Sequence, residues 1–382
     1  MSVDRTNQFK SIENFIRDTF NSNEFIPLHE PIFIGKEKQY LNECIDSTFV
    51  SSVGKFVDRF EENIANYTGS KFAIATSSGT AALHLALSLL DISKKEVILP
   101  SLSFVSTAHS IILNNAKPIF VDVDPYTMCI DPEKIEKAIT KKTGAILPVH
   151  FGGFSCDLDS ISKLCLKHNI PFVEDAAHAV GTSYKNKKIG THGKFTCFSF
   201  HPVKNLAMPS GGLISINDSN HKKLKKILNS KRWCGITNRI NSEYDVKEMG
   251  WNYYMNEFSA ALGLDQLNKL DQMNKKRKSI AKKYFTKINL EEKMPYNEEC
   301  SYHLYWILIK NRTKFRKKLD NLGIETGIHY KPIHLLSMYK NKKKLPITEK
   351  IGKQIVSIPI HPNLSNNQIN KIITAINKFA EI

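Results

Sequence analysis

Short apolar runs alternate with helical segments between residues 72 and 175, and this alternation limits the possible folds more than any other feature. Strands are expected at 72–75, 96–99, 118–123, 144–149 and 170–173, with helices at 81–90, 106–113, 132–139 and 158–168. Such a βαβ rhythm is typical of a mostly parallel sheet with helices on both faces. Ligands of these sheets bind at the carboxyl ends of the strands. We therefore predict an α/β fold with its functional site at that edge.

The 382 residues are enough for a large core and more than one domain. We expect a helical N-terminal extension over 1–24 and a large α/β domain over 25–265, in which 221–249 is first basic and helical, then irregular. Residues 266–382 indicate a smaller α+β domain. There a connecting helix to about residue 288 precedes a strand at 302–309 and helices at 312–322 and 368–379.

The chain is basic, with 54 Lys and Arg against 37 Asp and Glu. Its lysines are dispersed, the densest run (340–344) lies in loop-like sequence, and no nucleic-acid-binding motif is present, so we expect no nucleic-acid partner. A basic surface instead suits a phosphorylated substrate. No apolar run is long enough to cross a membrane, the N-terminus lacks a secretory apolar region, and the seven cysteines form no C-x-x-C pair. A cytoplasmic protein is expected.

Ser78, Gly79 and Thr80 form a small-residue turn between a strand and a helix. Such a turn presents unpaired backbone N–H groups and the positive end of the helix dipole, which together bind phosphate. An ordinary serine N-cap is the alternative.

Two further residues lie where chemistry is expected. Asp175 follows the strand at 170–173, where it serves either a ligand or a helix N-cap, and Lys204 follows an apolar run at 195–200. Phe104, in a loop after a strand, either stacks on a ligand or packs in the core. A phosphate cup, a carboxylate and a lysine are what pyridoxal 5′-phosphate (PLP) requires: the lysine forms a Schiff base, and the acid keeps the ring nitrogen protonated. A carboxylate 4 Å from that nitrogen contributes roughly 4 kcal/mol at an effective dielectric of ~20. His150, His192 and His201 lack metal-ligand spacing, so no metal is expected.

Residues 173–206 (VEDAAHAVGTSYKNKKIGTHGKFTCFSFHPVKNL) resemble the signature of the DegT/DnrJ/EryC1/StrS sugar aminotransferases. The resemblance continues over most of the chain, at 75–87, 96–112, 118–131, 145–153, 250–267 and 327–334. It implies a fold-type-I PLP transferase that forms a homodimer with shared active sites. At two places the chain departs from the family pattern: Pro209-Ser210-Gly211-Gly212 replaces a Gly-Glu/Asp-Gly-Gly segment, and Tyr254 replaces an arginine. These departures leave the identity of the sugar open.

The resemblance also implies roles for individual residues. Lys204 matches the Schiff-base lysine, Asp175 the partner of the pyridine nitrogen, and His178 the residue beside the ring hydroxyl. The remaining matches are Gly79, Thr80 and Ser199 at the phosphate, Asn252 reaching that phosphate from the neighbouring subunit, Phe104 stacked on the cofactor, and His329 and Tyr330 at the substrate pocket.

The resemblance implies a reaction that moves an amino group from glutamate to a nucleotide-linked keto-deoxysugar, a 4-keto-6-deoxyhexose, with Lys204 shuttling the proton. The residues around Lys204 leave the position of amination open, because His201-Pro202-Val203 resembles members that act at C4, whereas Asn205-Leu206 resembles members that act at C3. Two alternatives remain: a PLP-dependent sugar dehydratase, although such relatives carry histidine in place of the lysine, and a non-catalytic basic regulatory protein.

Overall fold

The central sheet consists of two groups of strands. In this computed structural model, which describes residues 25–340 and 343–380, the groups have the orders β1-β9-β8-β5 and β3-β2-β4. Parallel bridges from Ile146 to Phe172 and from Val149 to Asp175 join them. Only β9 in these groups runs antiparallel to its neighbours, which confirms the mostly parallel sheet. The strands are β1 (Phe72–Thr76), β2 (Glu96–Pro100), β3 (Lys117–Val121), β4 (Thr143–Ile146), β5 (Val173–Asp175), β8 (Phe195–Ser199) and β9 (Gly212–Ile216).

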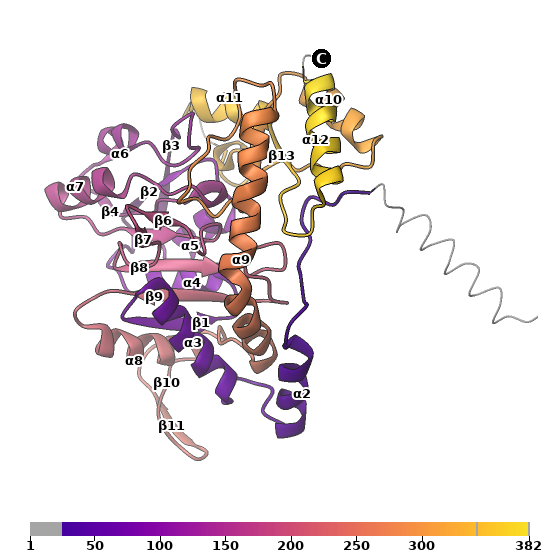
Figure 1. Cartoon of the computed structure of the whole chain (residues 1–382). Helices are drawn as coiled ribbons and strands as arrows, with labels where there is room; N and C mark the ends of the chain where they lie inside the picture. Colours follow the sequence, from indigo (N-terminus) through magenta and orange to yellow (C-terminus); the bar gives the residue numbers. More distant parts are fainter. Residues whose placement is uncertain (1–24, 341–342, 381–382) are drawn as a thin grey trace, which may run out of the picture.

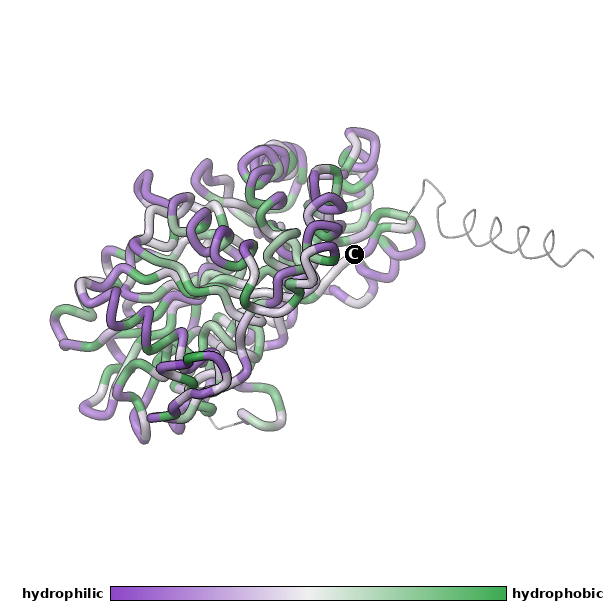
Figure 2. The backbone as a smooth tube through the Cα atoms, turned by 90° about the horizontal axis from the view of Figure 1, so that it is seen from below, coloured by the Kyte–Doolittle hydropathy of each residue, from purple (hydrophilic) through white to green (hydrophobic). Residues whose placement is uncertain are grey.

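Alternating side chains divide the interior into two cores, one on each face of the sheet. Ile74 and Ile214 belong to one hydrophobic cluster, whereas their chain neighbours Ala75 and Leu213 belong to the other. This is the two-residue period of a strand that is buried on both faces. The covering helices are α3 (Lys55–Thr68), α4 (Gly79–Leu87), α5 (Ser106–Leu113), α6 (Pro132–Ala138), α7 (Leu158–His168) and α8 (His221–Arg232). Figure 2 shows the hydrophilic segments concentrated toward the periphery.

Helix α9 (Glu257–Lys287) connects the sheet region with the C-terminal part of the chain and contacts α2 (Glu37–Ser47) and α3 (Figure 1). Beyond it, β12 (Tyr305–Leu308) pairs antiparallel with β13 (Ile355–Ile358), accompanied by α10 (Arg312–Asp320), α11 (Pro346–Gln354) and α12 (Asn366–Phe379). The domain division at residue 265 falls inside α9 and stays a prediction. The extension expected over 1–24 lies outside the described residues.

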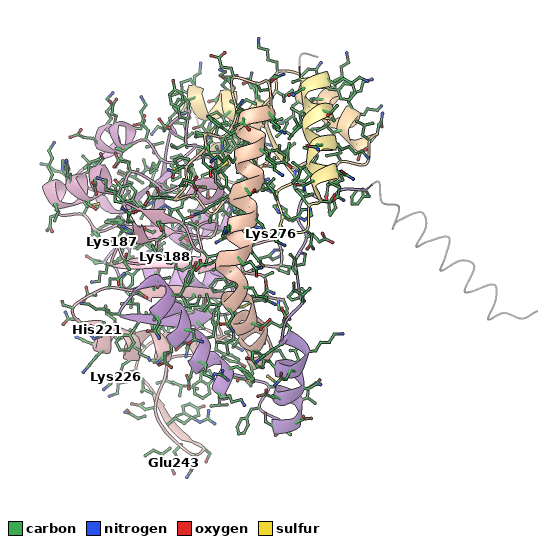
Figure 3. The ribbon with its side chains drawn as sticks, viewed as in Figure 1. Lys187, Lys188, His221, Lys226, Glu243 and Lys276 are labelled. Atoms are coloured by element: carbon green, nitrogen blue, oxygen red, sulfur yellow. The ribbon has the colours of Figure 1, made fainter. Side chains whose placement is uncertain are left out.

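Residues 236–246 form a hairpin where the sequence pattern predicts irregular structure. Strands β10 (Ile236–Ile240) and β11 (Glu243–Val246) pair antiparallel, and the hairpin projects from the body with Glu243 at its tip (Figures 1 and 3). All of β11 is exposed, so no buried face imposes an apolar period on its sequence. A second hairpin is shorter, with β6 (Ser183–Tyr184) and β7 (Lys187–Lys188). Within the described residues, no helix combines the length and apolar character that spanning a membrane requires.

Candidate active site

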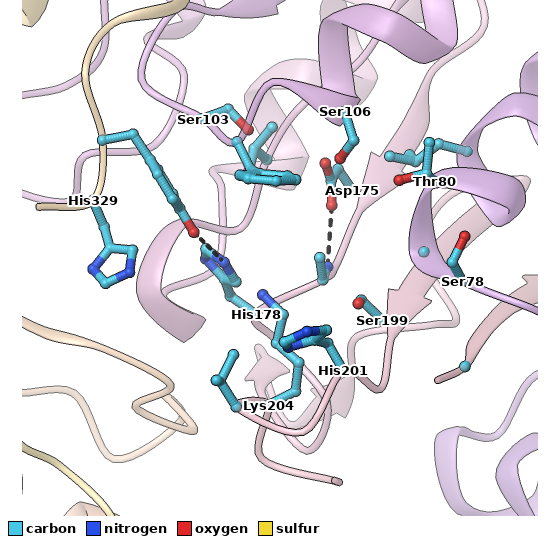
Figure 4. A pocket seen from close by; sticks show the side chains of 18 of the residues that line it. Ser78, Thr80, Ser103, Ser106, Asp175, His178, Ser199, His201, Lys204 and His329 are labelled. Carbon is cyan, nitrogen blue, oxygen red and sulfur yellow. Dashed lines mark hydrogen bonds between the residues drawn. The ribbon is translucent and has the colours of Figure 1, made fainter. Parts of the chain in front are cut away.

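A cavity of about 340 Å³ opens at the carboxyl ends of β5 and β8, beside the start of α4 (Figure 4). It brings together side chains that are far apart in the sequence, and Asp175, His178, Ser199 and Lys204 project into the same space. Of the predicted site residues, Asn252 is the one absent from its lining; it forms an antiparallel bridge with Trp233. The predicted residues that line the cavity are Ser78, Gly79, Thr80, Phe104, Asp175, His178, Ser199, Lys204, His329 and Tyr330.

The first turn of α4 forms one end of the cavity. Ser78 has extended backbone and caps the helix, since its Oγ accepts a hydrogen bond from the N–H of Ala81 at 3.2 Å. The N-cap and the phosphate cup are therefore compatible. The N–H groups of Gly79 and Thr80 lie in the first turn, where no carbonyl of the helix accepts them, so they remain available to a phosphate. A Cβ at Gly79 would lie 2.7 Å from Cβ of Ser199. Only glycine allows this close approach of helix and strand.

Asp175 is the last residue of β5 and is almost fully buried. Its Oδ2 accepts a hydrogen bond from Oγ1 of Thr107 at 2.7 Å, and its Oδ1 accepts one from the N–H of Ala177 at 3.1 Å. Burial raises the pKa of this carboxyl, although both hydrogen bonds and the charge of Lys204 act in the opposite direction. Residues 176–182 contain turns and irregular structure but no helix, so the helix N-cap interpretation of Asp175 is wrong.

Thr107, in the first turn of α5, is a site residue that the sequence did not indicate. Because its hydroxyl donates to Asp175, the hydroxyl of Ser103, 2.8 Å away, must donate to Thr107. The two hydroxyls thus form a directed chain that ends on the carboxylate. Thr107 and Asp175 are 68 residues apart, and no local pattern predicts their contact. The sequence offers one clue to this contact: Thr107 follows β2, and the carboxyl end of β2 lies at the same edge of the sheet as the end of β5 that carries Asp175.

Lys204 lies in the loop between β8 and β9, where its N–H donates to the carbonyl of His201. Burial lowers the pKa of its amine to about 8, while the negative charge of Asp175 opposes this shift. Among the described residues, none forms a hydrogen bond or ion pair with Nζ. An amine whose pKa is lowered by burial and that has no competing partner is suited to attack an aldehyde.

His178 is held as a neutral ring in one tautomer. Its Nδ1 accepts a hydrogen bond from the N–H of Gly152 at 3.2 Å, so the ring proton is on Nε2, which donates to the hydroxyl of Tyr330 at 3.2 Å. Burial lowers the pKa of His178 far below its usual value, and the charge of Lys204 acts in the same direction. His329, beside Tyr330, contacts Oγ of Ser357 through Nδ1 at 2.8 Å.

Phe104 is 56% exposed, and its ring centre lies 5.9 Å from that of Tyr330. The core-packing interpretation of Phe104 is therefore wrong, because its ring borders the cavity. Ser210 and Gly211, from the segment that departs from the family pattern, also line this cavity, together with Ser106 and His201.

His150 and Glu174 form a fully buried pair near the site. Nε2 of His150 lies 2.9 Å from Oε2 of Glu174, whose other oxygen accepts hydrogen bonds from Thr196 and Gly193. Burial acts to raise the pKa of Glu174, but these partners lower it overall. The described residues contain no group of three or more His, Cys, Asp or Glu side chains arranged to hold a metal ion.

The model of the DegT/DnrJ/EryC1/StrS aminotransferase family matches residues 32–377. The chain is 36% identical over 364 residues to the GDP-perosamine synthase of Escherichia coli O157:H7, covering 93% of this chain and 99% of that protein.

Solved structures are similar over the same length. The PLP form of the putative sugar aminotransferase Spr1654 from Streptococcus pneumoniae has a TM-score of 0.88 at 27% identity, covering 94% of this chain and 99% of that one. Helicobacter pylori PseC, an aminotransferase of pseudoaminic acid biosynthesis, has a TM-score of 0.88 at 30% identity, covering 94% and 100%. The family, the fold-type-I architecture and the PLP cofactor predicted from the sequence are confirmed.

Proposed function

This chain belongs to the DegT/DnrJ/EryC1/StrS aminotransferase family and is a PLP-dependent sugar aminotransferase, and we propose that it transfers the amino group of glutamate to a nucleotide-linked 4-keto-6-deoxyhexose. The observation that carries the proposal is the placement of Lys204 and Asp175 in one cavity with the α4 turn. The name of the E. coli relative favours a nucleotide-linked acceptor. The excess of basic residues suits a doubly anionic diphosphate.

The cavity residues divide into three groups according to what they would hold. The N–H groups of Gly79 and Thr80, with the hydroxyls of Ser78 and Ser199, would bind the cofactor phosphate. Asp175 would hold the ring nitrogen protonated, and Phe104 would cover the ring. His178 would hydrogen-bond the ring hydroxyl, while His329 and Tyr330 would border the sugar.

When bound, PLP supplies an aldehyde that captures amines and an electron-withdrawing ring that weakens bonds at the adjoining carbon. Lys204 has two tasks: its amine anchors the cofactor, and once released it removes the proton from the donor's α-carbon. Because the pKa of this amine is lowered to about 8, part of it is neutral near physiological pH and able to take that proton. Thr107 and Ser103 keep the carboxylate of Asp175 oriented during this transfer.

A homodimer with shared sites is part of the proposal. Asn252 does not reach the cavity of its own chain, as expected of a residue that serves the neighbouring subunit. Large apolar side chains also remain exposed before α3, namely Phe33, Ile34, Phe49 and Val53. Exposed apolar side chains gathered in one region are typical of a contact surface.

A visible spectrum of the purified holoenzyme tests the proposal. Glutamate should remove the visible absorbance of the lysine-bound cofactor, and 2-oxoglutarate should restore it, whereas Lys204→Ala should show neither change. Glutamate that is labelled in its amino group should then be incubated with each of a panel of nucleotide-linked 4-keto and 3-keto sugars. The sugar that receives the label is the acceptor. Full turnover by Lys204→Ala, or product without transferred label, would contradict transamination and favour the sugar dehydratase. The non-catalytic alternative does not agree with the family's activity.

A further inference from the structure

Arg277 on α9 is a buried cation with no hydrogen-bond or ion-pair partner in the part of the chain that the structure describes. Its side chain is 5% exposed, and its Nε and Nη1 are buried without hydrogen bonds. Within the described residues no hydrogen bond or ion pair reaches the guanidinium. Burial lowers its pKa to about 9, so it still carries its charge at neutral pH. A buried charge is costly unless it is paired, so an arginine in this state indicates a missing anion.

The charge of Arg277 acts on two neutral histidine rings, His29 and His361. Burial lowers the pKa of His29 to about 3 and that of His361 to about 4, and the charge of Arg277 acts in the same direction on both. Nδ1 of His303 and Nδ1 of His361 are buried and have no hydrogen-bond partner. The carboxylate of Glu30 lies 3.5 Å from Nδ1 of His361 and is half exposed, but it forms no ion pair with Arg277. We refer to Arg277, His29, His303 and His361 as the Arg277 cluster. It is polar, carries a positive charge and is incompletely hydrogen-bonded.

Two connections join the cluster to the cavity. The ring of His178, which lines the cavity, lies 4.4 Å from that of His303, and the ring of His303 stacks on that of His29 at 5.4 Å. Asn205, the residue after Lys204, donates a hydrogen bond to Asn274 at 2.9 Å, one turn before Arg277 on α9. On α9, Arg277 therefore follows by about one helical turn (~5.4 Å of axial rise) a residue that is tied to the Lys204 loop.

We propose that Arg277, with His29 and His303, forms a subsite for the carboxylate of the amino donor. The planar guanidinium presents parallel N–H groups that match the two oxygens of a carboxylate, and neutral imidazoles add donors without adding repulsion. Because the cluster is buried, the effective dielectric around it is low, and the hydrogen bonds from the guanidinium and from the imidazoles to a carboxylate are therefore stronger than in water. A dicarboxylic donor could place one end near Lys204 and the other at Arg277. This assignment rests on the proposed use of glutamate, and phosphate is the other anion with matching geometry.

Glutarate tests the subsite without turnover, because it has the carboxylates of the donor but no amine. We would titrate it into the holoenzyme by calorimetry and follow the thermal midpoint in parallel. Arg277→Met should weaken glutarate binding at least about tenfold and abolish the rise in midpoint on adding glutarate. Without glutarate its midpoint should equal or exceed that of the wild type, since an apolar side chain replaces an unpaired charge. Arg277→Lys, which keeps the charge but loses the planar fork, should bind glutarate with reduced affinity.

Lys276→Gln is the matched control, because it removes one positive charge from the exposed neighbouring position of the same helix (Figure 3). Its glutarate affinity should equal that of the wild type. Undiminished glutarate binding by Arg277→Met and Arg277→Lys, or equal weakening by Lys276→Gln, would overturn the proposal. If inorganic phosphate raises the thermal midpoint in a way that depends on Arg277, and glutarate does not, the carboxylate assignment is overturned. If glutarate binding depends on Arg277 but glutamate does not aminate the cofactor, the subsite is retained and glutamate is rejected as the amino donor.

Discussion

The hydroxyl of Tyr330 lies 3.2 Å from Nε2 of His178 and joins the C-terminal part of the chain to the sheet edge that carries Asp175. The proton on Nε2 is set from the other side of the ring, because Gly152 donates to Nδ1. A residue of the C-terminal part of the chain therefore orients a residue of the predicted cofactor site.

Tyr330→Phe should lower activity without unfolding the protein. Loss of this hydrogen bond costs about 0.5–1.5 kcal/mol, which corresponds to a decrease in kcat/KM of about 2- to 12-fold. Steady-state kinetics with the sugar substrate measures the effect. Tyr126→Phe, at a position that is 75% exposed, is the control and should keep full activity. Equal activity of both variants would show that the hydroxyl of Tyr330 does not position His178 for the reaction.

Thr107→Val should loosen the cofactor and shift the acid side of the pH profile. The hydrogen bond from Thr107 acts to lower the pKa of Asp175, so its removal raises that pKa further and decreases the ionised fraction at low pH. An unsatisfied buried acceptor costs about 1–3 kcal/mol, or about 5- to 150-fold in affinity. Cofactor release during dialysis and the pH dependence of kcat/KM measure both effects. Thr107→Ser, which keeps the hydroxyl, should behave as wild type, and a shared defect would mean that the methyl group is what matters.

The apoprotein should capture PLP faster as the pH rises through about 8. The amine is reactive only when neutral, and burial lowers the pKa of Lys204 from 10.5 to about 8. Between these values the unfolded chain holds more protons than the folded one, so the stability of the apoprotein should also rise with pH in this window. Recovery of visible absorbance after adding PLP gives the rate. A midpoint near 10.5 would contradict the burial of the amine.

Subunits that are defective at different positions should complement each other if the active sites are shared. Lys204→Ala and Asn252→Ala homodimers should each be weak. A mixed dimer has one site with both native residues, so random mixing should restore about a quarter of wild-type activity. The mixture is unfolded, refolded together and assayed, with separately refolded variants as controls. Activity no higher than the mean of the separate variants would place Asn252 and Lys204 in the same subunit's site.

Much of the fold follows from local pattern. The strand and turn before α4 were predictable because residues 72–80 combine an apolar run with small residues and a capping serine. The β10–β11 hairpin was not, because most of its residues are exposed and neither strand has a fully buried face that would impose an apolar period. Strand β9 is likewise not apparent from the sequence, since burial of all its residues on both faces removes the alternation that marks a half-buried strand.

The candidate site, like the fold, is only partly predictable from local sequence. Lys204, Asp175 and the Ser78–Thr80 turn stand out in the sequence because each follows an element whose type and end are encoded locally. The contacts that tune them are not encoded locally: Thr107 meets Asp175 across 68 residues, and Tyr330 meets His178 across 152. Arg277 was one basic residue among 54 Lys and Arg until packing buried its side chain and left its Nε and Nη1 without hydrogen bonds among the described residues. Charge and residue type are properties of the chain, but burial and partners arise only when distant segments pack together, and these determine pKa, orientation and affinity.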